Sequence, residues 1–166
     1  MTYTISPSLA NNSLSSGSIV TDTIASFQQL TTDEQLGLLW TLYKNMGRSI
    51  TPAAPGAARM QFAEGLLEQV KAMPQQQQLQ FMRDLVNRKS TADTRAYGVL
   101  SSNTKLAFWY QLAVWMNEGT VIPVPSFYKL SDAASRLFGQ ISKLSFGQQI
   151  TIMRQVVVGM GVDPLA

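Results

Sequence analysis

The chain has 166 residues, and with 45% hydrophobic residues it can bury the core of one compact domain. It contains neither His nor Cys, which excludes disulfides, thiol nucleophiles, a His general base and metal sites built on either residue. The net charge of +3 comes from thirteen scattered basic residues, which form no dense block for a phosphate backbone, so nucleic acid is excluded as the expected partner.

The N-terminal segment 1–18 is polar and rich in Ser, Thr and Asn, and it lacks the basic start and apolar run of a signal peptide. We expect it to be an extension, either flexible or a short covering helix, that precedes a single helical domain at 19–166. No stretch of the sequence is long and apolar enough to span a bilayer. The expected location is therefore the cytoplasm.

Helix-start and helix-stop signals follow one another along the chain and predict an all-α fold. Thr31 and Glu34 are typical of a capping box, and Gly47 is expected to end the helix that they begin. Asn103 is expected to cap a later helix that ends at Gly119. The predicted helices cover 21–30, 31–46, a segment from Pro55 through Val70, a segment from Pro74 through Val86, 91–100, 103–118, a segment from Ser131, and 145–158.

The second half of the chain repeats the first at an offset of roughly 70 residues. Segment 77–86 aligns without a gap with 148–157, and 36–40 aligns with 106–110. This period is too long for a solenoid repeat and favours a duplicated helical sub-bundle. We predict two four-helix halves packed on each other, with a seam between them where a ligand can bind.

Each half carries one aromatic stripe at helical spacing. The first stripe is Leu36, Leu39, Trp40 and Tyr43, and the second is Leu106, Trp109, Tyr110, Ala113 and Met116. Such a stripe most often belongs to a packed core. The chain also has eight Met residues, whose flexible side chains suit an adaptable apolar tunnel. The pattern alone therefore leaves both a packed core and a hydrophobic ligand site open.

Two short strings are more specific, Pro-Gly-Ala-Ala at 55–58 and Phe-Trp-Tyr at 108–110. Around them stand Glu34-Gln35-Leu36, Leu39-Trp40, Tyr43, Met46-Gly47, Met60–Glu64, Lys105-Leu106, Pro123, Pro125, Tyr128–Leu130, Gly147–Thr151 and Arg154. Over about residues 18–162 the chain resembles the effector (N-terminal) domain of the cyanobacterial orange carotenoid protein, and in length it is most similar to the related helical carotenoid proteins, which consist of this domain alone.

The resemblance implies an all-α fold of two interleaved four-helix bundles that hold one carotenoid, a ketocarotenoid such as canthaxanthin or echinenone. The positions matching the family's pigment tunnel are Leu36, Trp40, Tyr43, Met82, Leu106, Trp109, Tyr110, Val124 and Tyr128. To these we add Leu39, Gly56, Asn103, Ala113, Met116, Pro125, Ile150, Thr151 and Met160. Ala113 stands where the family has a Gly on the tunnel wall. Trp40 and Trp109 are expected to pack on the pigment, and Tyr43 and Tyr110 to lie where the tunnel meets water.

The resemblance also implies partners. Arg154 matches a position on the surface that meets either the regulatory domain or the phycobilisome, and the fold is expected to bind a chloride ion. The chain ends at Ala166, so we expect no regulatory domain and no light-driven switching. Further expected partners are the phycobilisome, on the thylakoid surface, or a separate carotenoid carrier resembling the regulatory C-terminal domain. The expected oligomeric state is a monomer or weak dimer.

The expected function is photoprotection by quenching of singlet oxygen. The alternatives are constitutive quenching of phycobilisome excitation energy, a generic apolar-lipid carrier and a purely structural adaptor. An enzyme is not expected, because the ten acidic residues are dispersed and the nearest candidates, Asp84 and Asp93, lie where surface roles suffice.

Overall fold

The computed structural model describes residues 7–46 and 60–165, with side chains from residue 17 onwards. Within these ranges every regular element is a helix, which confirms the all-α prediction. The elements are α1 (Pro7–Gln29), α2 (Thr32–Met46), η2 (Met60–Phe62), α3 (Glu64–Ala72), α4 (Gln75–Asn87), α5 (Ala92–Gly98), α6 (Ser102–Glu118), α7 (Asp132–Ser142) and α8 (Phe146–Val158). No helix in this part of the chain is both long and apolar enough to cross a membrane.

The helix termini follow mostly from local sequence. The predicted capping box before α2 is present, because the Thr31 amide donates to Glu34 Oε2 at 2.9 Å and the Glu34 amide to Thr31 Oγ1 at 3.2 Å. Gly119 ends α6 in the left-handed conformation, with φ of 81°. The predicted cap of α6 was wrong: Ser101, and not Asn103, accepts the Thr104 amide, at 3.2 Å.

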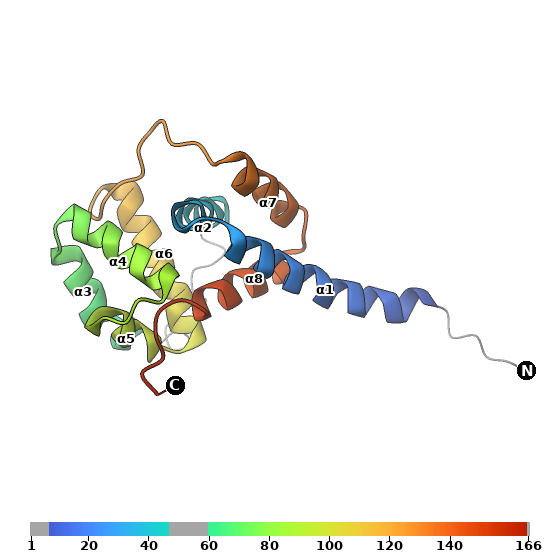
Figure 1. The fold of residues 1–166 in the computed structure, drawn as a ribbon, viewed down its shortest axis with the longest axis horizontal. Helices are drawn as coiled ribbons and strands as arrows, with labels where there is room; N and C mark the ends of the chain where they lie inside the picture. The colour runs from blue at the N-terminus through green and yellow to red at the C-terminus, as the bar shows by residue number, and fades with distance from the viewer. Residues whose placement is uncertain (1–6, 47–59, 166) are drawn as a thin grey trace, which may run out of the picture.

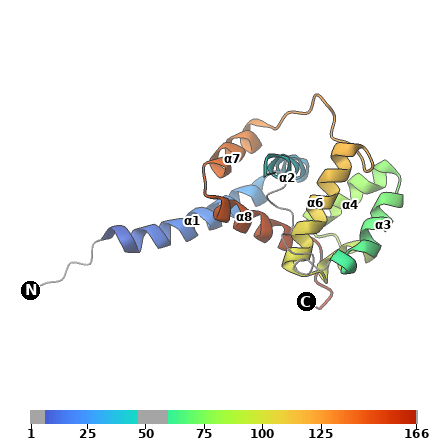
Figure 2. The same ribbon diagram turned by 180° about the vertical axis from the view of Figure 1, so that it is seen from behind.

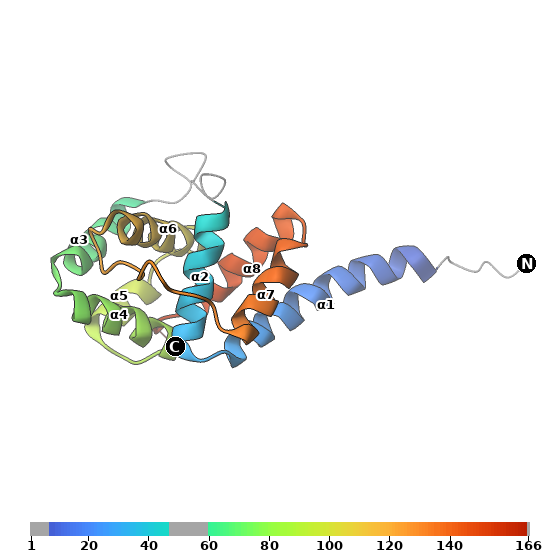
Figure 3. The ribbon, with the colours of Figure 1, turned by 90° about the horizontal axis from the view of Figure 1, so that it is seen from above.

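Two helices differ in length from the prediction. α1 begins at Pro7, well before the predicted start at residue 21, so the predicted division at residue 18 falls inside a helix. Figures 1 and 3 show its N-terminal part extending beyond the other helices. The helix predicted from Pro55 begins only at Glu64, after the short turn η2. The predicted signals at Gly47, Pro55 and Gly56 lie outside the described residues.

The helices form two groups that lie side by side (Figures 1 and 2). One group contains α1, α2, α7 and α8, with contacts between α1 and α8, α1 and α7, and α2 and α7. The other contains α3, α4, α5 and α6, in which α3 contacts α4 and α5, and Phe108 on α6 meets Phe81 on α4 and Tyr97 on α5 edge to face. α2 packs against α4 and α6, and α6 packs against α8, so these three contacts form the seam between the groups.

The two halves of the internal repeat do not coincide with the two bundles. At the offset of roughly 70 residues α1, α2, α3 and α4 correspond to α5, α6, α7 and α8, so each bundle takes two helices from each half of the sequence. The bundles are therefore interleaved, and neither sequence half forms a bundle by itself. Short turns join α1 to α2 and α3 to α4, whereas the longer connection from α6 to α7 carries the chain from one bundle to the other.

Candidate functional site

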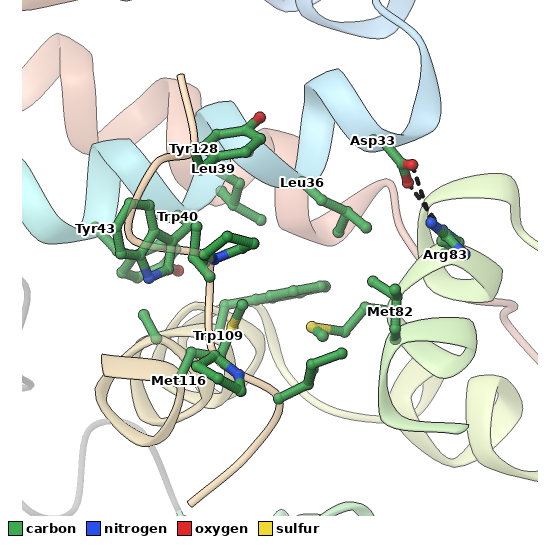
Figure 4. A pocket seen from close by; sticks show the side chains of 17 residues that line it. Asp33, Leu36, Leu39, Trp40, Tyr43, Met82, Arg83, Trp109, Met116 and Tyr128 are labelled. Atoms are coloured by element: carbon green, nitrogen blue, oxygen red, sulfur yellow. Dashed lines mark hydrogen bonds and ion pairs between the residues drawn. The ribbon is translucent and has the colours of Figure 1, made fainter. Parts of the chain in front are cut away.

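A cavity of about 350 Å³ lies at the seam between the bundles (Figure 4). Its walls come from α2, α4, α6 and the segment 122–128, which connects α6 to α7. This volume falls within the range of about 300–1,000 Å³ that is usual for small-molecule sites. The lining residues are Asp33, Leu36, Gly37, Leu39, Trp40, Tyr43, Leu79, Met82, Arg83, Trp109, Ala113, Met116, Ile122, Pro123, Val124, Pro125 and Tyr128.

Most of the residues predicted for a pigment tunnel meet in this one cavity. They are Leu36, Leu39, Trp40, Tyr43, Met82, Trp109, Ala113, Met116, Val124, Pro125 and Tyr128. The two aromatic stripes face each other across it, because α2 and α6 are repeat-related helices that pack against each other at the seam. The wall is almost entirely aromatic, aliphatic and thioether, which suits a long apolar ligand and offers little to a polar one.

A second cavity, of about 220 Å³, adjoins the first. Trp40, Tyr43 and Ala113 line both cavities, and the second also includes Tyr110 and Lys44. The Lys44 ammonium lies 4.9 Å from the centroid of the Trp40 ring, so a cation covers one face of this indole. The two cavities are therefore neighbours that share Trp40, Tyr43 and Ala113 as wall residues.

Hydrogen bonds from outside the cavity fix the orientation of two aromatic walls. The Trp109 indole Nε1 donates to the Tyr97 hydroxyl at 3.0 Å, and this hydroxyl donates to the Val157 carbonyl of α8 at 2.5 Å. The Tyr43 hydroxyl donates to the Leu106 carbonyl of α6 at 2.7 Å. Buried rings with satisfied polar atoms have one preferred position, so these walls are preorganised.

The pKa values of three tyrosines in and behind the cavity wall are raised. Burial raises the pKa of the Tyr43 and Tyr97 phenols well above the ordinary value for tyrosine. The pKa of Tyr128 is also raised, first by burial and then by the nearby Asp33 and Glu34 carboxylates. The expectation that Tyr43 lies where the tunnel meets water was wrong: the residue is only 2% exposed, and its hydroxyl has its hydrogen-bond partner inside the seam.

The other predicted residues lie elsewhere. Leu106 is buried and contributes its carbonyl to Tyr43, and Ile150 packs against the core. The Thr151 hydroxyl donates to the Gly147 carbonyl of its own helix at 2.8 Å. Met160 lines a separate cavity beside Phe27 and Val86. Gly56 lies outside the described residues.

Asn103 and Arg154 also lie apart from the cavity. The exposed Asn103 Oδ1 accepts from Arg154 Nε at 3.2 Å, which joins α6 to α8. At the repeat offset this pair corresponds to Asp33 and Arg83, whose Nε–Oδ1 and Nη2–Oδ2 distances are 2.8 and 3.0 Å. Each half of the repeat therefore contains a polar side-chain contact between two helices that meet at the seam.

Sequence reasoning did not assign several wall residues. The Asp33–Arg83 ion pair lies at one end of the cavity and Trp40 and Tyr43 lie at the other (Figure 4). Its partners are fifty residues apart, and local patterns carry no signal for such a pairing. Gly37 could have been found, because a glycine in the middle of a strong helix and within an aromatic stripe is unusual. The other unassigned wall residues are Leu79, Ile122 and Pro123.

Comparison with known proteins bears on this geometry. The family model for the N-terminal domain of the orange carotenoid protein matches residues 12–163. The chain belongs to this family. The resemblance drawn from the sequence is thereby confirmed, and the family is one of carotenoid-binding proteins and not of enzymes.

Relatives of two lengths resemble the chain. It is 55% identical over 153 residues to an orange carotenoid-binding domain-containing protein of Nostoc sp., covering 92% of this chain and 90% of that protein. It is 48% identical over 145 residues to the orange carotenoid-binding protein of Limnospira maxima, covering 87% of this chain but only 46% of that protein. The chain thus spans less than half of the longer relative.

Solved structures show the same two lengths. The Anabaena (Nostoc) sp. orange carotenoid protein binding canthaxanthin matches with a TM-score of 0.80 and 46% identity, covering 87% of this chain and 47% of that one. The Red Carotenoid Protein of the same organism, also binding canthaxanthin, matches with a TM-score of 0.75 and 43% identity, covering 86% and 97%. These matches confirm the predicted fold of two interleaved bundles.

Proposed function

We propose that this protein binds one carotenoid in the seam cavity and protects against light damage by quenching singlet oxygen. The observation that carries the proposal is the cavity itself, an apolar groove walled by Trp40, Tyr43, Trp109 and Tyr128 in a chain of this family. Similar structures bind canthaxanthin, which supports a ketocarotenoid as the ligand. When bound, a conjugated polyene supplies low-lying excited states that accept the energy of singlet oxygen.

The residues fit such a ligand. Trp109 and Met82 are buried side chains that face the cavity, and Tyr43 has its only polar atom turned away to Leu106. A polyene would therefore meet ring faces, thioethers and aliphatic groups along its length. Burial of several hundred Å² of polyene is worth on the order of 10 kcal/mol before the costs of association are subtracted. The protein's part is to exclude water and to hold one conformation of the pigment.

Quenching of phycobilisome excitation energy is a second candidate. It is favoured by Arg154, which is half-buried, bonded to Asn103 and placed on the surface of α8 away from the pigment cavity. This guanidinium could pair with an acidic group of a partner without disturbing the cavity. A separate carotenoid carrier would bind to the same surface of α8 around Arg154. The chloride ion, a cytoplasmic location at the phycobilisome and a monomeric or weakly dimeric state remain predictions.

The test of pigment binding uses tryptophan variants. The protein is produced in a carotenoid-synthesising host, and the visible spectrum of the purified wild type is compared with that of a Trp40→Ser, Trp109→Ser double variant. We expect a strong carotenoid band in the wild type and at least about a tenfold loss of bound pigment in the double variant, because two ring walls are removed. Trp115→Ser is the matched control, since Trp115 lies outside both cavities.

The test of quenching compares the lifetime of photosensitised singlet oxygen in the presence of the pigment-loaded and the pigment-free protein. A shorter lifetime with the loaded protein supports the proposal. Equal lifetimes would favour the antenna-quenching candidate, which predicts instead that the loaded protein lowers phycobilisome fluorescence. A colourless, folded wild type would contradict carotenoid binding and favour the lipid carrier.

A further inference from the structure

Gly37 leaves a notch in the cavity-facing side of α2, and the tip of Tyr128 fills it. A Cβ atom built on Gly37 would lie 1.7 Å from Tyr128 Oη and 2.6 Å from Cζ, closer than any two such atoms can approach. The phenol therefore rests directly on the backbone of α2. A glycine inside a helix destabilises the helix relative to alanine. At position 37 this cost is accompanied by the room that the absent side chain leaves for the Tyr128 hydroxyl.

Tyr128 lies in the connection from α6 to α7, which crosses over α2 in Figure 3. One end of this connection is fixed where the Ile122 amide donates to Oε1 of the buried Gln78 at 2.7 Å. The other end is fixed where Ser131 caps α7. Between these anchors, Tyr128 closes a turn through its amide, which donates to the Pro125 carbonyl at 3.0 Å.

This part of the connection forms the outer wall of the cavity. Ile122, Val124 and Tyr128 line it, whereas the neighbouring Phe127 is 83% exposed. Figure 4 shows the Tyr128 ring beside α2, above Leu39 and across the cavity from Met116. Tyr128 as a residue is 37% exposed, so the position of its ring depends more on the contact of its hydroxyl end with Gly37 than on burial in a core.

We propose that Gly37 is a positioning residue for the ligand site: its missing side chain lets Tyr128 rest on α2 and so holds segment 122–128 as the outer wall of the cavity. This role rests on the proposed carotenoid binding. A side chain at position 37 lifts the ring, loosens the wall and opens a path by which an apolar ligand leaves. The retention of the ligand, and not the overall fold, is the property that depends on Gly37.

The experiment uses Gly37→Ala, with Gly139→Ala on α7 as the matched control, because a Cβ at Gly139 meets nothing within 4 Å. Pigment-loaded proteins are mixed with empty phosphatidylcholine vesicles, and the rate of carotenoid transfer is followed by absorbance. We expect Gly37→Ala to release pigment about tenfold faster than the wild type, in line with the cost of overpacking. Gly139→Ala should release it at the wild-type rate.

A double variant distinguishes an effect of Gly37→Ala that acts through the Tyr128 ring from a general loss of stability. Tyr128→Ala should also release pigment faster, and adding Gly37→Ala to it should cause no further increase, because no ring is left to displace. If the effects of the two substitutions multiply, or if Gly37→Ala behaves like Gly139→Ala, the proposal is overturned.

A readout on the pigment-free protein keeps this inference apart from the proposed function. Nitration of the Tyr128 ring by tetranitromethane, followed by peptide mass spectrometry, should be faster in Gly37→Ala than in the wild type and in Gly139→Ala. An unchanged rate of nitration would show that Gly37 does not hold the Tyr128 ring in place, and would overturn the proposal. Suppose that Gly37→Ala is nitrated faster but the wild type takes up no carotenoid. The contact between Gly37 and Tyr128 would then be supported, whereas its role in ligand retention and the proposed function would both be overturned.

Discussion

Tyr97 is the residue on which the orientation of the Trp109 wall depends. Its side chain is fully buried on α5, accepts from the Trp109 indole and donates to the α8 carbonyl of Val157. Its ring also carries the Lys105 ammonium at 5.3 Å from the centroid. One phenol thus joins α5, α6 and α8, although it lines neither of the two cavities at the seam.

Tyr97→Phe removes both hydrogen bonds and leaves the buried Trp109 indole Nε1 without this partner, whereas the Val157 carbonyl still accepts from the Met160 amide at 3.3 Å. We expect the free energy of unfolding to fall by about 1–3 kcal/mol, which urea denaturation can measure. Because the Trp109 ring loses its fixed orientation, the absorption band of bound carotenoid should shift as well. An unchanged band in a destabilised protein would contradict the positioning role of Tyr97.

The buried phenols also predict a dependence of stability on alkaline pH. The pKa values of Tyr43 and Tyr97 are raised in the folded protein above the unfolded value of about 10. Above that pH the unfolded chain binds fewer protons than the folded one, so the free energy of unfolding falls as the pH rises from about 10 towards the folded pKa values.

This decline can be followed by urea denaturation at a series of pH values. Tyrosinate absorbance from these two residues should appear only as the helical circular dichroism is lost, and Tyr43→Phe should make the decline shallower. Ionisation of all tyrosines in a protein that keeps its helices would contradict the burial of these two phenols.

At the scale of helices, the caps are the features that sequence predicts best. Thr31 with Glu34, Ser131 and Ser145 all begin helices as expected, because the signal lies within four residues of the chain. Asn103 was misassigned because Ser101 and Asn103 are both good capping residues, and only the backbone conformation decides between them. Ser101 has the extended conformation, with ψ of 162°, and Asn103 is already inside the helix.

A pair of substitutions tests this assignment. Ser101→Ala should lower the free energy of unfolding by about 1 kcal/mol, the usual cost of losing an N-cap. Asn103→Ala should cost less, because it removes only an exposed hydrogen bond to Arg154. Thermal or urea unfolding measures the loss of stability in each variant. A larger loss in Asn103→Ala than in Ser101→Ala would show that Asn103 is the N-cap.

At the scale of the whole molecule, the feature that the sequence predicted least well was which helices of the two halves make up each bundle. The repeat at 77–86 and 148–157 showed that a duplication exists, but helices from either half satisfy the same apolar pattern. Only the contacts of α2 with α4 and α6 show that the repeat-related stripes meet across one seam. This meeting places Trp40 and Trp109 in the same cavity, which the sequence pattern alone could only suggest.

Which residues line the cavity depends on packing between helices that are distant in sequence. Ile150 and Thr151 on α8, and Met160 just after it, lie outside the described cavity, because α8 packs against α1 and against α6 without contributing a residue to the lining. Asp33 and Arg83 lie in the wall although neither is apolar, because their ion pair joins α2 to α4 at its edge. Long-range packing decides both cases.

The central claim is that one carotenoid lies in the seam cavity. The most direct test is a crystal structure of the pigment-loaded protein. We predict polyene density between α2, α6 and segment 122–128, in contact with Trp40, Trp109 and Tyr128 and passing Ala113 towards Tyr110. Pigment bound elsewhere on the protein, with the Tyr128 ring still closing an empty cavity, would contradict the account.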